Sequence, residues 1–175
     1  PGDGLDVLEL HVDWTTPSAS TLSRAGLLPL TPADAFRHGP YQRVVYRNFG
    51  AFESLVTTDE ATIRPQWNLE WHHLRRRPGG PWTAFEHGVF DPDEGWERLP
   101  TASLDGAGNV ALVWQKSDEP PTALPGERKS LLQYSAREPG DPAGTLRAPY
   151  TLAQSVDVDP SGRFGDYTSI VTDPS

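Results

Sequence analysis

Apolar and polar residues alternate along most of this chain, in short runs that are separated by turn-forming residues. The first run, LDVLELHVDW at 5–14, has a period of two and predicts a strand that is buried on one side. The apolar side of this strand carries Leu8, Leu10, Val12 and Trp14. We therefore expect this side to pack against a core.

The same period of two predicts further strands along the rest of the chain. They are RVVYRNF (43–49), ESLVTT (53–58), WNLEWHHL (67–74), TAFEHGVF (83–90), PTASLD (100–105), NVALVWQ (109–115), LLQYSAR (131–137), YTLAQSV (150–156) and YTSIVTD (167–173). Two segments, 15–42 and the Pro-rich 117–130, are expected to be irregular loops. Helix signals are confined to one turn after Pro32, so the expected fold class is all-β.

One unit of the pattern recurs: a run of apolar and small polar residues that ends on Asp in a tight turn. The clear copies are LPTASLDGAGN, which contains Asp105, and DYTSIVTDPS, which contains Asp173. A looser third copy, AFESLVTTDEA, surrounds Asp59. Recurrence of one strand-and-turn unit predicts a repeat architecture, in which each unit buries apolar surface against its neighbours.

The turn after the strand at 100–105 has the chemistry of a short hairpin loop. The Asp105 side chain can accept backbone N–H bonds, and Gly108 and Asn109 supply the residue types that turns of this kind require. Leu104 and Val110 would flank the loop. This segment predicts a pair of antiparallel strands.

Length and composition support antiparallel, blade-like repeats of a partial β-propeller. The 175 residues would hold about three blades of ~40–50 residues, whereas closed propellers have about four to eight. Eighteen Pro and sixteen Gly, with 36% hydrophobic residues, are typical of short strands and many turns. The sequence thus predicts one partial propeller over 1–175, with the remainder of the propeller or self-association of its open edges covering the exposed apolar faces.

Charge and cysteine content exclude several functions. A net charge of −9, from 15 basic and 24 acidic residues, opposes the binding of nucleic acid. The dense basic run at 75–77 is interpreted as a solvated strand end rather than an anion site. The lack of cysteine excludes disulfides, thiolate catalysis and Cys-ligated zinc. No apolar run approaches the ~18 residues of a membrane span.

Several segments of the chain occur in a familiar order. They are VDWTTPSAST, YRNFGAFESLV, ASLDGAGNVAL, LLQYSAREPGDPAGTL and RFGDYTSIVTDPS. Together they resemble a family of large secreted bacterial proteins with sialidase-like β-propellers, similar to the exo-alpha-sialidase superfamily. The sharpest element is formed by Arg163, Gly165, Asp166, Tyr167 and Ser169, followed by Asp173 and Pro174.

The resemblance is that of a divergent copy. Phe164 stands where the family usually has Trp, GWERLPTASLD replaces an Arg-Trp-x-Gly-Ser-like strand start, and the family's cysteines are missing. The resemblance implies a propeller fold, repeat phasing and an extracellular or cell-surface location. It carries no catalytic residue to this chain. The Asp-box of sialidases is only echoed by Ser103, Asp105 and Asn109, which we interpret as a plain hairpin turn.

Two acidic turns are candidate calcium sites. Asp157, Asp159 and Ser161 match the start of a calcium-binding loop, but Thr168 occupies the position where such loops place a bidentate Glu. A simple Asp-Pro turn is the alternative for this segment. The turn DPDEG at 91–95 offers the same chemistry more weakly.

Aromatic residues are the remaining candidates for ligand binding. Trp96 is the candidate for an exposed ring that stacks on a sugar, with Asp91 and Asp93 in the neighbouring turn; the alternative is a Trp that caps a blade edge. The stripe of aromatic and aliphatic side chains at 67–71 is predicted to lie in the core between blades. His72 and His73 are adjacent, so their side chains would point to opposite faces of a strand and would not share a metal ion.

Three functions remain open. The first is a noncatalytic propeller segment of a secreted or surface protein that binds glycan or protein through its loops. The second is part of a sialidase-type glycoside hydrolase, which would need converging arginines, a Tyr nucleophile and carboxylates. The third is a structural repeat of a large extracellular protein. The sequence favours the first of these.

Overall fold

The computed structural model describes residues 4–29, 43–63, 66–91, 95–117, 129–157 and 167–173, and these residues form an all-β structure. One 3-10 turn, η1 (Pro17–Ala19), is present beside the strands. The strands are β1 (Gly4–His11), β2 (Thr21–Pro29), β3 (Val45–Asn48), β4 (Glu53–Ile63), β5 (Gln66–Arg76), β6 (Thr83–Phe90), β7 (Trp96–Leu104), β8 (Val110–Ser117), β9 (Ser130–Arg137) and β10 (Tyr150–Gln154).

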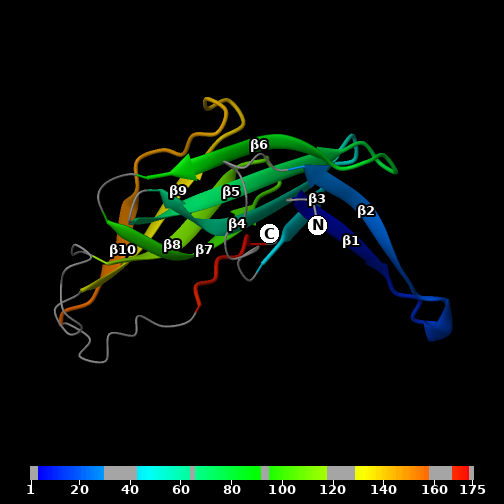
Figure 1. Ribbon diagram of the computed structural model, residues 1–175, viewed down its shortest axis with the longest axis horizontal. Helices are drawn as coiled ribbons and strands as arrows, with labels where there is room; N and C mark the ends of the chain where they lie inside the picture. The colour runs from blue at the N-terminus through cyan, green and yellow to red at the C-terminus, as the bar shows by residue number, and fades with distance from the viewer. Residues whose placement is uncertain are drawn as a thin grey trace.

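The strands form three antiparallel sheets that follow one another along the chain (Figure 1). The β1–β2 hairpin, called the arm below, is followed by a middle sheet of order β3-β4-β5-β6 and a far sheet of order β10-β9-β8-β7. Both four-stranded sheets are meanders in which each strand pairs with the next along the chain. The expected all-β antiparallel class is confirmed, and the described residues form no closed barrel or propeller.

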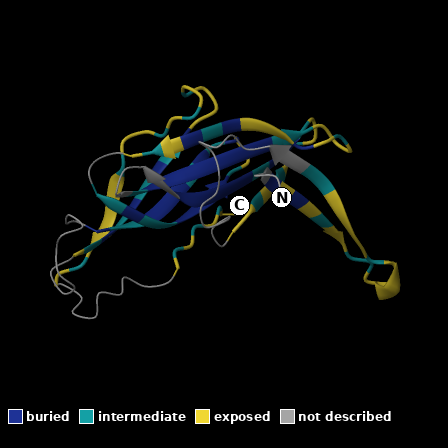
Figure 2. Ribbon diagram, viewed as in Figure 1, coloured by how far each residue is buried: buried dark blue, intermediate teal, exposed yellow. Residues whose placement is uncertain are grey.

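The middle sheet lies between the arm and the far sheet. Its strands β4 and β5 bury Val56, Leu69 and Trp71 against Leu112 and Trp114 of β8, and all five side chains are fully buried. This confirms the predicted core position of Leu69 and Trp71. The opposite face of the middle sheet packs against the arm. Figure 2 shows that the interior strands of the middle and far sheets are buried.

The arm packs on the middle sheet through Leu5 and Val7, which lie on the side of β1 that the sequence pattern did not favour. Leu5 and Val7 are each 9% exposed, whereas Leu8 is 59% and Leu10 is 66% exposed. The expectation that Leu8, Leu10, Val12 and Trp14 form the buried side is therefore wrong: Trp14 is also 89% exposed, and of the four residues Val12 alone is half-buried. The physical reason is that Leu5 and Val7, together with Leu74 and Trp82, form a small core of their own.

The second strand of the arm lies inside a segment that was expected to be irregular. Within 15–42, residues Thr21–Pro29 form β2 and pair with β1 over the whole length of that strand. The pairing partner explains the difference, because a segment with weak strand signals of its own gains a complete ladder along β1. Of the other expected loop, 117–130, residues 118–128 lie outside the described residues.

The predicted hairpin turn at Asp105 is confirmed. One Asp105 carboxylate oxygen accepts the backbone N–H groups of Ala107 (2.9 Å) and Asn109 (2.8 Å), and the other accepts the Asn109 side-chain amide (2.7 Å). Gly108 has a φ of 87°, and Leu104 pairs with Val110. Burial raises the pKa of Asp105, but these hydrogen bonds outweigh it and lower the pKa.

The other two copies of the strand-and-turn unit do not repeat this structure. Asp59 lies inside β4 opposite Glu70 and is fully buried, so a turn at Asp59 was wrong. Residues 167–173 form no strand, although a strand was expected there. Instead, the side chains of Thr168 and Thr172 donate hydrogen bonds to the carbonyls of Leu99 and Leu104, which replace a backbone ladder along β7.

Candidate binding groove

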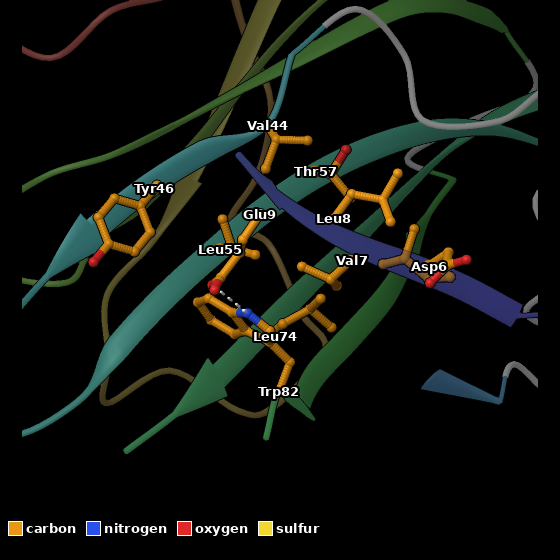
Figure 3. Close-up of a pocket in the computed structure, with 11 residues that line it drawn as sticks. Asp6, Val7, Leu8, Glu9, Val44, Tyr46, Leu55, Thr57, Leu74 and Trp82 are labelled. Carbon is orange, nitrogen blue, oxygen red and sulfur yellow. Dashed lines mark hydrogen bonds between the residues drawn. The ribbon is translucent and has the colours of Figure 1, made fainter. Parts of the chain in front are cut away.

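A groove of about 370 Å³ opens between the arm and the middle sheet (Figure 3). Strand β1 forms one wall, and side chains of β3, β4 and β5 with their flanking residues form the other. The groove is lined mainly by Leu5, Val7, Leu8, Val44, Tyr46, Leu55, Leu74 and Trp82, with Asp6, Glu9 and Thr57 at polar positions. Val44 is 53% and Tyr46 is 52% exposed, so the mouth of the groove is apolar and open.

Charged pairs fix the arm to the body at one end of the groove. The Trp82 indole N–H donates to Glu9 Oε1 (3.3 Å), and Arg76 Nη1 lies 2.6 Å from the same oxygen. Arg76 also pairs with Glu53 Oε2 at 2.7 Å and lies over the Trp82 ring at 4.5 Å. The polar groups at this end thus satisfy one another, which leaves apolar side chains as the main contact surface for a ligand.

The groove continues into a second hollow along the arm. This hollow is lined by Glu9, Leu10, His11, Ser23, Tyr46 and Arg76, so Glu9 and Tyr46 belong to both. From Leu5 to His11 the strand extends about 20 Å. The two hollows adjoin at these shared residues and together are called the arm groove below.

Each wall of the arm groove contains one edge strand: β1 in the first wall, and β3, beside the interior strands β4 and β5, in the second. β1 pairs only with β2, and β3 pairs only with β4, in the described sheets. An edge strand presents backbone N–H and C=O groups along its free side and can accept another strand there. The arm groove therefore combines apolar side chains with backbone hydrogen-bonding groups.

The predicted sugar-stacking residue, Trp96, packs against another aromatic side chain. Trp96 is half-buried and stacks on Trp67 with ring centroids 5.9 Å apart, while the Arg98 guanidinium lies 4.2 Å from the Trp67 ring centre. Asp91 is exposed, and Asp93 lies outside the described residues. The structure thus brings Trp96 to a Trp–Trp–Arg stack at the start of β7, away from the arm groove.

The candidate calcium loop is described only at its start. Asp157 is exposed, whereas Asp159 and Ser161 lie outside the described residues, as do Arg163, Gly165 and Asp166 of the sharpest resemblance element. Tyr167 is described and is 74% exposed. The calcium interpretation of this loop stays a prediction.

His72 and His73 point to opposite faces of β5, as the sequence indicated. His73 faces the interior between the sheets, where its Nε2 lies 3.1 Å from Ser54 Oγ and its Nδ1 lies 3.9 Å from Glu86 Oε2. Ser54 and His73 are fully buried and Glu86 is 8% exposed. A serine, a histidine and a carboxylate therefore follow one another in space, but their burial closes them to a substrate, and we assign them to the core.

Because His73 is buried neutral, the protein should lose stability in mild acid. Burial and the nearby charges of Arg75 and Arg137 lower the pKa of His73 from 6.5 to about 3. Between these values the unfolded chain binds a proton that the folded chain does not, so the free energy of unfolding falls as the pH drops. Where His73 is the main group that takes up a proton on unfolding, the free energy of unfolding changes by about 1.4 kcal/mol per pH unit.

Urea unfolding between about pH 7 and about pH 5 measures this slope. His73→Gln should flatten the pH dependence, and His11→Gln, at an exposed histidine of the arm, should leave it unchanged. An equal slope in the wild type and in His73→Gln would show that His73 does not set it.

The arm groove was not predicted from the sequence. Its lining residues come from strands far apart in the chain, and the apolar residues of β1 were assigned to a different buried side. A usable signal was present at 43–49, where the consecutive apolar residues Val44, Val45 and Tyr46 place apolar side chains on both faces of one strand.

No protein-family model, curated protein or solved structure matches the chain. The resemblance to sialidase-like propellers stays a prediction. No helix in the described part of the chain has the length and apolar character needed to cross a lipid bilayer.

Proposed function

We propose that this chain is a noncatalytic binding module that holds an extended protein segment in the arm groove. The observation that carries the proposal is the pair of adjoining hollows between the edge strand β1 and the middle sheet, whose edge strand is β3; Leu8, Val44, Tyr46 and Trp82 line the first hollow. Recognition by strand addition uses these two components: backbone hydrogen bonds give affinity, and pockets for alternate side chains give specificity.

The composition of the arm groove favours a protein segment over a glycan. Its walls are mostly aliphatic, and the carboxylate of Glu9 is already paired with Arg76 and Trp82. Sugar hydroxyls would find few polar partners on such walls, whereas Val, Leu or Ile side chains of a strand would bury apolar surface. The net charge of −9 further favours a segment that is neutral or basic.

A propeller architecture and an extracellular location belong to the same proposal. Two successive four-stranded meanders that stack through their faces have the strand order of propeller blades, which supports the blade interpretation of the sheets. The resemblance to secreted sialidase-like propellers supports a location outside the cell. A hydrolase is less favoured, because Arg76 and Arg137 each already pair with a carboxylate.

Selection from a display library of about seven to ten random residues tests the proposal, because such lengths match the arm groove. We expect enrichment of sequences in which apolar and polar residues alternate and basic residues flank the run. A synthetic peptide of the enriched sequence should then bind the purified protein in solution. Enrichment of unpatterned hydrophilic sequences would contradict the proposal.

Paired variants locate the binding. Leu8→Asn and Val44→Thr alter exposed groove residues and should weaken binding of the peptide, whereas Leu152→Asn alters an equally exposed leucine on β10 and should not. Equal binding by all variants would overturn the proposed location. If no peptide is selected and an oligosaccharide array binds instead, the ligand class is wrong.

Self-association of the open faces stays a prediction. Leu10 and Leu22 pair across the arm and are each 66% exposed, which supplies apolar surface for a second copy. Light scattering should show an increase of mass with concentration, and Leu10→Lys with Leu22→Lys should lower that increase. A monodisperse monomer at all concentrations would contradict it.

A further inference from the structure

Two histidines and a glutamate converge on the face of the middle sheet that is turned away from the far sheet. Glu70 and His72 are two residues apart on β5 and share this face, and His87 of β6 lies directly opposite His72 in the ladder. His87 Nε2 lies 2.8 Å and His72 Nε2 lies 3.4 Å from the same Glu70 oxygen, Oε1. The ligand atoms of the three residues all lie within 4.8 Å of one another.

We propose that Glu70, His72 and His87 bind one divalent transition-metal ion of the zinc class. Two imidazole nitrogens and one carboxylate form a ligand set that suits Zn²⁺ and its first-row neighbours. The proposal goes beyond the arm groove and is independent of it, because the three ligands line neither of its hollows.

The separations between the ligand atoms suit such an ion. Zinc binds imidazole nitrogen and carboxylate oxygen at about 2.0–2.2 Å, so neighbouring ligands of a tetrahedral ion lie about 3.3 Å apart. The observed separations of 2.8 and 3.4 Å bracket this value. The imidazoles of His72 and His87 stack with ring centroids 4.7 Å apart and 21° between their planes, and both Nε2 atoms lie near Glu70 Oε1.

The local charge also favours a cation. Glu70 is 1% exposed, and Asp59, opposite it in the ladder, is fully buried, so two carboxylates lie in one buried region. The Glu70 carboxylate faces the Nε2 atoms of both His72 and His87. A dication held by Glu70 would offset this negative charge.

The arrangement leaves room for access to the ion. Glu70 and His72 are held rigidly by burial, with side chains 2% and 4% exposed, while the His87 side chain is 31% exposed. Three protein ligands leave a fourth position of a tetrahedral ion to water or to a small anion. The His87 side is the exposed side of the site and so the route by which the ion would enter.

Titration of the purified, metal-free protein with Zn²⁺ and with Co²⁺ tests the site. We expect one ion per chain, a visible Co²⁺ spectrum of the intensity typical of four- or five-coordinate sites, and a melting temperature that rises with added Zn²⁺. His87→Ala should weaken Zn²⁺ binding by at least ~100-fold and abolish the Co²⁺ spectrum. Its partial exposure makes it the ligand whose removal disturbs the core least.

His11→Ala is the matched control, because His11 is an exposed histidine on β1. It should bind Zn²⁺ as the wild type does, and circular dichroism should show that both variants are folded. Equal Zn²⁺ affinity in His87→Ala and the wild type would overturn the proposal. Weak Zn²⁺ binding shared by all variants would assign the ion to the acidic surface and would also overturn the proposal. The absence of Zn²⁺ binding would overturn it as well.

Discussion

Replacing Gly88 with alanine should lower the free energy of unfolding by about 3 kcal/mol or more. A Cβ atom at Gly88 would lie 2.2 Å from the carbonyl oxygen of Gly144 and 2.6 Å from Trp71 Nε1. Neither neighbour can yield easily. Trp71 is fully buried in the core, and the loop that carries Gly144 is held to β6 by a hydrogen bond from the Gly144 N–H to Glu86 Oε1 (3.1 Å).

Gly140→Ala is the matched control for this prediction. Gly140 belongs to the same loop, and nothing lies within 4 Å of a Cβ atom added there. Urea unfolding should show a large fall in the midpoint for Gly88→Ala and almost none for Gly140→Ala. Similar midpoints for Gly88→Ala and the wild type would contradict the close packing of the loop on β6.

Replacing Arg137 with methionine should cost about 3–5 kcal/mol of stability. Arg137 Nη1 lies 2.7 Å from Glu86 Oε2, and both side chains are only 4% exposed. Methionine keeps much of the apolar stem but removes the charge, so the Glu86 carboxylate would stay buried without its cationic partner. Removal of one member of a buried pair is strongly destabilising for this reason.

A double-mutant cycle separates the charge effect from lost packing. Arg137→Met combined with Glu86→Gln should be more stable than Arg137→Met alone, because no uncompensated carboxylate remains. Thermal or urea unfolding of the four proteins gives the coupling energy. Simple addition of the two single effects would show that the buried pair contributes little.

Local chemistry predicted much of the fold. The Asp105 turn follows from side-chain and glycine preferences within five consecutive positions, 105–109, so it could be read without knowledge of its surroundings. Most strands follow from the period of two. The core position of Leu69 and Trp71 follows from the same alternation, because side chains two residues apart share a face.

Long-range packing decided what the sequence could not show. β1 has apolar residues on both faces, and only its contact with Leu74 and Trp82 selects Leu5 and Val7 for burial. Asp59 looks like a turn residue, but β4 runs past it because β5 pairs with it along its whole length. These outcomes depend on which strands meet, and local pattern carries little information on that.

The metal-binding cluster was missed for a related reason. The neighbour of His72 in the sequence is His73, which alternation places on the opposite face, whereas its neighbour in space is His87 of the next strand. The alternation of Glu70 with His72 was the available signal, and it gains meaning only once β6 brings a third ligand opposite. The partners of a strand residue are therefore best sought two positions away and across the ladder.

Hydrogen–deuterium exchange with and without a selected peptide is the most direct test of the proposed function. If the arm groove holds an extended segment, bound peptide should slow amide exchange at β3 (Val45–Asn48) and along β1, the edge strands in its two walls. Protection confined to β9 and β10, or no change at either edge strand while the peptide stays bound, would contradict the account.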